Sequence, residues 1–106
     1  MSGHYNLEHL LLTNYDQSWS RNGISGERIA RRLGDLSKIG LTSLNGVSRV
    51  GFSPLEQQAK ELVMKWMREA GMTVSQDGAG NVVGRIAGLN KEADSIASGS
   101  HVDSVP

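Results

Sequence analysis

The sequence has no cysteine and no excess charge of either sign, and these two absences exclude several classes of protein. Without cysteine there is no disulfide scaffold, no thiolate ligand for zinc and no thiol nucleophile, so histidine and carboxylate chemistry remain. Eleven Lys and Arg residues balance eleven Asp and Glu residues, so no strong field attracts the chain to nucleic acid or anionic lipid. We therefore expect neither nucleic acid nor a membrane surface as a partner.

Long hydrophobic runs are also missing. No apolar stretch approaches the roughly 20 residues of a membrane span, and no Lys or Arg precedes the short leucine run near the N-terminus. We expect a soluble, cytoplasmic chain. The length of 106 residues permits one domain at most, with a small core. Residues 1–24 are polar and predict an irregular N-terminal segment, whereas residues 25–106 carry the recognisable elements.

The first recognisable element is an amphipathic helix over residues 25–39 that ends near Gly40. Its apolar positions Ile29, Leu33 and Leu36 follow the i, i+4, i+7 spacing of one helix face. Residues 41–52 contain two glycines and no clear period, so we expect a loop there.

A second helix, over residues 54–70, has start and stop signals at both ends. Ser53 is placed to cap it, Pro54 suits the first helical position, and Glu56 completes a capping box. Gly71 stands where a left-handed cap ends a helix. The expected apolar stripe consists of Leu55, Ala59, Leu62, Val63, Trp66, Met67 and Ala70. Core packing explains this stripe better than a ligand site.

The last third of the chain predicts strands. Residues 72–76 and 81–87 read as a hairpin whose turn lies at residues 77–80, which favours a glycine turn over a dinucleotide-binding loop. Residues 95–102 are small and mostly uncharged, as in a strand buried on both faces. The result is a three-stranded sheet with too few helices to cover it, so we expect the rest of the domain beyond Pro106.

One candidate for metal chemistry follows that third strand. His101 and Asp103 lie two residues apart, so on an extended chain both project to the same face. A neutral imidazole binds a divalent ion through one nitrogen, and its other N–H is usually oriented by a carboxylate. The spacing alone is a weak signal, because an ordinary surface pair has the same pattern.

Four arginines allow two interpretations. They could bind a substrate carboxylate through bidentate hydrogen bonds, or they could be solvated or structural, which we favour. These residues are Arg28, Arg31, Arg32 and Arg49. No serine lies in the strand–turn–helix context of a nucleophile elbow.

Several short blocks, taken in order, resemble the N-terminal part of the family of N-carbamoyl-L-amino-acid hydrolases and allantoate amidohydrolases. The family lies within a superfamily of dinuclear metallo-aminoacylases and carboxypeptidases. The blocks are NGVSR at 45–49, FSP at 52–54, WMREAG at 66–71, Asp77 with GN at 80–81 and GR at 84–85, and GSHVDSVP at 99–106. Ser104 stands where threonine is usual in that pattern.

The resemblance implies a fold and a site. The fold would be an α/β, zinc-peptidase-like catalytic domain with a mixed sheet flanked by helices, of which residues 25–106 form an incomplete N-terminal part. Two divalent ions, Zn or Mn with Co or Ni as alternatives, would bind per full-length subunit. His101 matches a metal ligand and Asp103 the catalytic carboxylate that supports it. The remaining ligands, the general base and the substrate-binding residues would follow Pro106.

The resemblance also implies an activity. The small-molecule substrate would be an N-carbamoyl-L-amino acid, whose carbamoyl C–N bond is hydrolysed, in a homodimer formed through a domain outside this chain. Allantoate and 3-ureidopropionate are alternative substrates. Two other classes stay open: a metallopeptidase or aminoacylase of the wider superfamily, and a non-catalytic module that binds a partner through the stripe on residues 54–70.

Overall fold

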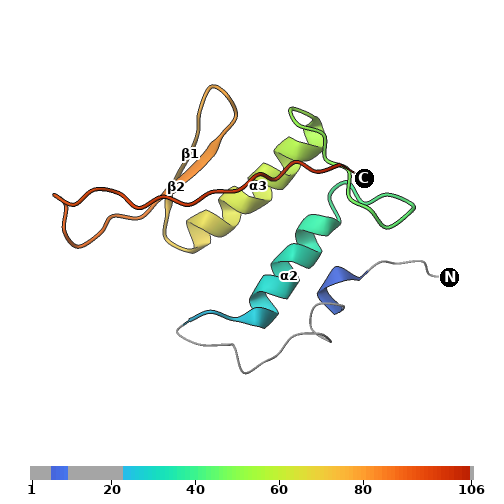
Figure 1. The fold of residues 1–106 in the computed structure, drawn as a ribbon, viewed down its shortest axis with the longest axis horizontal. Helices are drawn as coiled ribbons and strands as arrows, with labels where there is room; N and C mark the ends of the chain where they lie inside the picture. Colours follow the sequence, from blue (N-terminus) through green and yellow to red (C-terminus); the bar gives the residue numbers. More distant parts are fainter. Residues whose placement is uncertain (1–5, 10–22, 106) are drawn as a thin grey trace. The chain divides into compact units, whose positions relative to one another are not determined.

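The structure of the protein is a computed structural model that describes residues 6–9 and 23–105 (Figure 1). Its regular elements are the helices α2 (Gly26–Ser37) and α3 (Pro54–Glu69) and the strands β1 (Thr73–Gln76) and β2 (Val82–Arg85). This composition confirms the mixed α/β class.

The described residues form two compact units. The first runs through Arg49 and also includes Ser104 and Val105, and the second contains residues 50–103. Residues 7–9 are helical, and most of the irregular segment predicted over residues 1–24 lies outside the described residues. In the described part of the chain, no helix is long and apolar enough to cross a membrane.

Helix α2 begins where the sequence predicts. Ser25 has extended backbone angles, and its hydroxyl accepts a hydrogen bond from the N–H of Arg28 at 3.2 Å, which satisfies one of the unpaired donors of the first turn. The helix ends at Ser37, and Gly40 follows with a φ of +89°. The predicted helix over residues 25–39 is therefore confirmed, to within the usual uncertainty at its ends.

The buried face of α2 differs from the predicted one. Ile29 and Leu33 are 49% and 43% exposed, whereas the buried positions are the small residues Gly26, Ala30, Gly34 and Ser37. A Cβ on Gly34 would lie 3.0 Å from the Cβ of Glu8, so the missing side chain lets the two backbones approach closely. The prediction from hydrophobic spacing was wrong because close backbone packing selects small side chains.

Helix α3 begins with the predicted capping box in a shifted form. The Ser53 hydroxyl accepts from the N–H of Glu56 at 3.2 Å, and the Glu56 carboxylate accepts from the N–H of Phe52. The reciprocal bond thus reaches one residue further than a standard capping box. Glu56 is only 8% exposed, so its side chain is buried at the start of the helix.

The end of α3 follows a Schellman motif. Gly71 has a φ of +87°, its N–H donates to the carbonyl of Arg68 at 2.9 Å, and the N–H of Met72 donates to the carbonyl of Met67 at 3.0 Å. The predicted left-handed cap is confirmed. Gly71 ends the helix at this point, and β1 begins two residues later at Thr73.

The core of the second unit lies between α3 and the hairpin. Ala59 is fully buried and Met64 is 8% exposed; the sequence analysis placed only Ala59 in the stripe. Of the other predicted stripe residues, Leu55 and Ala70 are exposed and the rest are half-buried. The stripe is thus only partly covered.

Strands β1 and β2 pair in antiparallel register, with Val74 opposite Gly84 and Gln76 opposite Val82. Val74, Val82 and Gly84 are the half-buried positions, and they share one face because side chains alternate along a strand. A Cβ on Gly84 would lie 2.7 Å from the Sδ of Met72. The predicted hairpin is confirmed, and its glycine leaves room for methionine side chains against the sheet.

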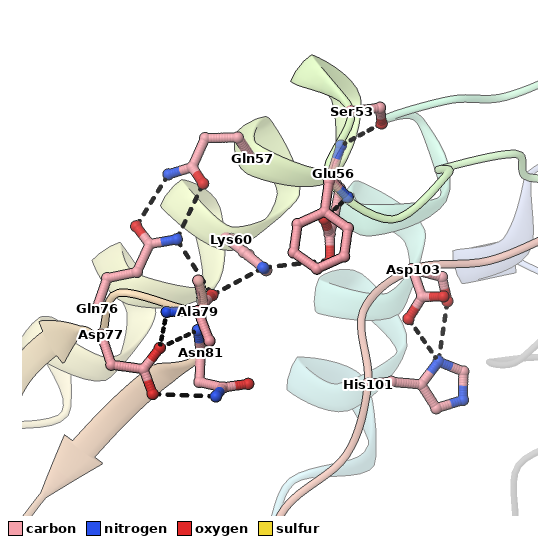
Figure 2. A network of polar contacts seen from close by, with 12 residues as sticks. Ser53, Glu56, Gln57, Lys60, Gln76, Asp77, Ala79, Asn81, His101 and Asp103 are labelled. Carbon is pink, nitrogen blue, oxygen red and sulfur yellow. Dashed lines mark hydrogen bonds and ion pairs between the residues drawn. The ribbon is translucent and has the colours of Figure 1, made fainter.

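Polar side chains connect the hairpin to α3 (Figure 2). Gln57 and Gln76 exchange two amide hydrogen bonds of 3.1 and 3.0 Å. Lys60 donates to the carbonyl of Gly80 at 2.7 Å and forms an ion pair of 3.2 Å with Glu56. The side chains of Lys60 and Glu56 are 14% and 10% exposed, so the pair is largely removed from water yet has additional hydrogen-bond partners.

The third predicted strand is absent. Residues 95–102 have no strand assignment, and Ile96 is fully exposed. A strand requires a neighbour that pairs with its main chain over several residues, and residues 95–101 take part in no strand ladder in the described part of the chain. The sheet therefore has two strands rather than three, and the prediction that residues 95–102 are buried on both faces was wrong. The expected loop over residues 41–52 contains an isolated bridge between Leu41 and Val47, and its Arg49 forms another with Ser104.

The hairpin turn is organised by one carboxylate. Asp77 accepts from the N–H groups of Ala79 and Asn81 at 2.9 and 2.8 Å and from the Asn81 side-chain amide at 3.0 Å. The hydrogen bond from the Asn81 side chain, followed by that from its backbone, lowers the pKa of Asp77 below the ordinary value.

Three glycine substitutions separate backbone strain from steric contact. Gly71→Ala should lower the free energy of unfolding by about 1–2 kcal/mol, because φ is +87° in otherwise open space. Gly40→Ala should cost more, since its Cβ would also lie 2.5 Å from the carbonyl oxygen of Ser48. Gly78→Ala, with neither feature, should change stability by less than about 0.5 kcal/mol. Urea denaturation followed by circular dichroism measures the free energy of unfolding of all three variants. Equal losses would show that neither the positive φ nor the steric contact decides the cost.

The Asp77 turn should also depend on pH. Since the folded pKa is below the unfolded one, the carboxylate stabilises the turn above the ordinary Asp pKa of about 3.9, and this contribution is lost as pH falls through the lowered value. Asn81→Ala should raise the pKa of Asp77 toward its ordinary value in an NMR titration of the carboxyl carbon. Asn90→Ala, in a different loop, serves as the control and should leave it unchanged.

Candidate functional site

The candidate pair lies on an extended, exposed stretch of chain. The His101 side chain is 81% exposed and that of Asp103 is 49% exposed. The Nδ1 atom of His101 lies 3.2 Å from Oδ1 of Asp103, so the two side chains face each other (Figure 2). The prediction that both project to the same face is confirmed, although the segment is not part of a sheet.

The contacts of the imidazole determine its tautomer. Besides the carboxylate, Nδ1 lies 2.9 Å from the main-chain carbonyl oxygen of Asp103. Both neighbours are oxygens that only accept hydrogen bonds when the carboxylate is ionised, so Nδ1 must carry the proton. In the neutral imidazole, Nε2 then holds a lone pair.

This arrangement suits one ligand of a divalent ion. An imidazole with its Nδ1–H held by a carboxylate and a carbonyl presents Nε2 in a fixed orientation, as metal-binding histidines do. The described residues contain no group of three or more His, Cys, Asp or Glu side chains that could hold a metal. His101 and Asp103 therefore fit a metal site in chemistry and orientation, but they form only part of one, and their roles in metal binding and catalysis stay predictions.

The chain is fixed immediately after this pair. Ser104 and Arg49 form an antiparallel bridge, in which the N–H of each residue donates to the carbonyl of the other at 2.9 and 3.0 Å. The Ser104 hydroxyl donates to the carbonyl of Val47 at 2.7 Å and lies 3.3 Å from the N–H of Arg49. All three residues belong to the first unit.

The Arg49 side chain is directed to the end of α2. One of its nitrogens, Nη1, donates to the carbonyl of Leu36 in the last turn of α2 at 2.7 Å and to that of Ile39, just after the helix, at 3.0 Å. Arg49 is 9% exposed, and burial lowers the pKa of its guanidinium below the ordinary value. These contacts support the structural interpretation of this arginine over the binding of a substrate carboxylate.

Sequence reasoning did not identify the partners of Arg49. An arginine ten residues after a predicted helix end gives no local signal of a cap, because the loop between them must fold back first. Ser104 likewise gave no signal beyond its place in the GSHVDSVP block. The other three arginines named in the sequence analysis are exposed or half-buried in α2, and Arg28 donates to the carbonyl of Gly23 at 2.7 Å.

Known proteins align with about three quarters of this chain. The chain is similar to an N-carbamoyl-L-amino acid amidohydrolase from Geobacillus stearothermophilus, with 46% identity over 82 residues, which is 77% of this chain and 20% of that protein. An enzyme of the same name from a Pseudomonas species is 44% identical over 82 residues, again 77% of this chain and 20% of that protein. Allantoate deiminase 1 from Glycine max is 39% identical over 74 residues, or 70% of this chain and 15% of that protein.

These comparisons confirm the resemblance carried by the sequence blocks: the chain has curated homologues among the N-carbamoyl-L-amino acid amidohydrolases and the allantoate deiminases. The chain spans about a fifth of the length of the first relatives it matches. No protein-family model and no solved structure matches the chain.

Replacing Arg49 should weaken the first unit. Arg49→Met removes both hydrogen bonds to the end of α2 and should lower the free energy of unfolding by about 1–3 kcal/mol. The loss of unfolding free energy in Arg49→Lys should lie between zero and that of Arg49→Met, because an ammonium keeps the charge but lacks the planar fork of a guanidinium. Arg31→Met is the control on the exposed side of α2, with an expected change within about 0.5 kcal/mol. Equal losses for Arg49→Met and Arg31→Met in urea denaturation would show that the guanidinium does not cap the helix.

Proposed function

We propose that this chain is part of a metal-dependent amidohydrolase that cleaves the carbamoyl C–N bond of N-carbamoyl-L-amino acids. Its homologues include proteins named for this activity, at 46% and 44% identity. The observation that carries the proposal for this chain is the orientation of His101. Its Nδ1 faces two acceptor oxygens of Asp103, which leaves an exposed Nε2 for an ion.

Each residue of the pair has a separate role in this proposal. His101 binds a divalent ion through Nε2. Asp103 keeps the proton on Nδ1 and fixes the direction of the ring; its charge also makes the imidazole a stronger ligand. Two bound ions, Zn²⁺ or Mn²⁺ with Co²⁺ or Ni²⁺ as alternatives, would supply an activated water and polarise the carbamoyl carbonyl. The remaining ligands and the general base would come from outside the described residues.

The proposed reaction is a balanced hydrolysis. Water adds to the carbamoyl carbon, the bond from that carbon to the amino-acid nitrogen breaks, and the nitrogen takes up a proton. The products are the amino acid and carbamate, which decomposes to carbon dioxide and ammonia. The pair in this chain does not itself form a complete site, so we propose that the 106 residues alone bind metal weakly and show no turnover.

The fold and setting of this activity are proposals as well. The domain would be a zinc-peptidase-like catalytic domain, to which residues 25–106 contribute α2, α3 and the hairpin. We propose a homodimer formed through a domain outside this chain, and a cytoplasmic location. The balance of Lys and Arg against Asp and Glu favours a small-molecule substrate over nucleic acid.

Allantoate is the second candidate substrate. Relatives named allantoate deiminase are 39% identical to the chain, against 46% for the first amidohydrolase, and this difference favours N-carbamoyl-L-amino acids. No relative named here supports 3-ureidopropionate, the other alternative from the sequence. Both candidates and 3-ureidopropionate share the hydrolysis of a ureido C–N bond, so the assay compares all three.

The test uses a polypeptide that carries this chain and reaches the length of the curated relatives. After loading with Zn²⁺ or Mn²⁺, it should release ammonia from N-carbamoyl-L-methionine faster than from allantoate or 3-ureidopropionate. His101→Ala should abolish turnover and lower metal content, and Asp103→Asn should weaken metal binding about 10- to 100-fold. His9→Ala, another exposed histidine, is the control and should change neither. Full metal content and turnover in His101→Ala would refute the proposal.

A further inference from the structure

A short loop of the first unit contains an asparagine followed directly by a glycine. Asn45 and Gly46 lie between Leu41 and Val47, which form an isolated antiparallel bridge. Asn45 is exposed, and its φ of +63° lies in the left-handed region that asparagine tolerates better than most residues. The loop therefore exposes Asn45 to water.

Hydrogen bonds between Thr42 and the residues that follow it close this loop. The N–H of Thr42 donates to the carbonyl of Gly46 at 2.8 Å, and the N–H of Asn45 donates to the carbonyl of Thr42 at 3.0 Å. The Thr42 hydroxyl accepts from the N–H of Gly46 at 3.0 Å. Thr42 thus contacts Gly46 through both its main chain and its side chain.

The Gly46 nitrogen is also the atom that can modify Asn45. After losing its proton, it attacks the side-chain amide carbon of Asn45 and closes a succinimide ring, and the amide nitrogen leaves as ammonia. Water then opens the ring at one of its two carbonyls, which yields aspartate or isoaspartate. The net change is the hydrolysis of one amide to a carboxylic acid and ammonia. Glycine favours the ring closure because it has no side chain to obstruct it.

The hydrogen bond to Thr42 opposes this reaction. It engages the proton that the Gly46 nitrogen must lose, and it must break before the nitrogen can turn toward the amide carbon. We propose that Asn45–Gly46 is a site of spontaneous deamidation in the folded protein and that the Thr42 hydroxyl sets its rate. The inference concerns the first unit alone and does not depend on the proposed function.

The modification should also change the loop. Isoaspartate at position 45 adds a negative charge and lengthens the main chain between Thr42 and Gly46 by a methylene group. The two hydrogen bonds between these residues should then lose their geometry. We expect the isoaspartyl form, separated by anion exchange, to unfold at a lower temperature than the unmodified protein.

The experiment incubates the polypeptide of the relatives' length at mildly alkaline pH and follows its tryptic peptides by mass and isoaspartate content. Trypsin cleaves after Lys38 and Arg49, so Asn45 is released in a peptide that contains no other amide side chain. The peptide of residues 86–91 is the internal control. Its exposed Asn90 is followed by a lysine, whose side chain obstructs ring closure, so it should convert much more slowly.

Three variants separate the site from the residue that controls it. Thr42→Ser keeps the hydroxyl and should convert within about twofold of the unsubstituted rate, whereas Thr42→Val should convert about 2- to 10-fold faster, the range for one lost hydrogen bond. Asn45→Gly permits the positive φ without an amide and should yield no isoaspartate in this peptide. The unsubstituted protein unfolded in urea should convert at least as fast as folded Thr42→Val.

Each part of the proposal has its own contrary result. If position 45 stays unmodified in the folded protein while it converts fully in urea, the site is overturned. Equal rates in Thr42→Ser and Thr42→Val overturn the role of the hydroxyl, even if Thr42→Val has a lower melting temperature. Should Thr42→Val fail to fold, the unsubstituted protein still decides, because equal rates with and without urea would show that no contact of the folded loop slows the reaction.

Discussion

The first unit depends on how Arg49 satisfies polar groups of two other stretches of chain at once. Its guanidinium takes up two carbonyls at the end of α2, and its main chain pairs with Ser104. A buried cation is costly unless hydrogen bonds replace its water, and here the helix carbonyls do so. The same residue thus contacts the end of α2 and pairs with Ser104, so it connects separate stretches of the first unit.

The second unit uses a comparable device at the start of α3. The carboxylate of Glu56 is buried with Lys60 and also accepts from the main chain of Phe52, while the ammonium reaches the hairpin through Gly80. Each charge thus has a partner besides the other charge, which offsets the loss of hydration. With few fully buried apolar side chains among the described residues, these polar contacts specify how the hairpin lies on the helix.

Local signals in the sequence predicted local structure well. Both helix starts, the glycine cap at Gly71 and the hairpin follow from residues that act on their immediate neighbours. The same holds for the facing side chains of His101 and Asp103, since a separation of two residues on an extended chain decides it. Predictions failed where a distant partner decides the result. Ile29 and Leu33 are exposed because small residues pack on the other side, and residues 95–102 have no strand assignment because no strand ladder forms along them within the described ranges.

The sequence by itself determined the absence of cysteine chemistry, the places where helices begin and end, the spacing of the His101–Asp103 pair, and a resemblance that homologues bear out. Only the tertiary structure decided which face of α2 is buried, where the guanidinium of Arg49 binds, and that Ser104 is the point at which the chain after Asp103 is held. The physical reason is the separation along the chain over which each interaction acts. Caps, turns and alternation act over a few residues, whereas a contact between Arg49 and Ser104 requires the folding of all the chain between them.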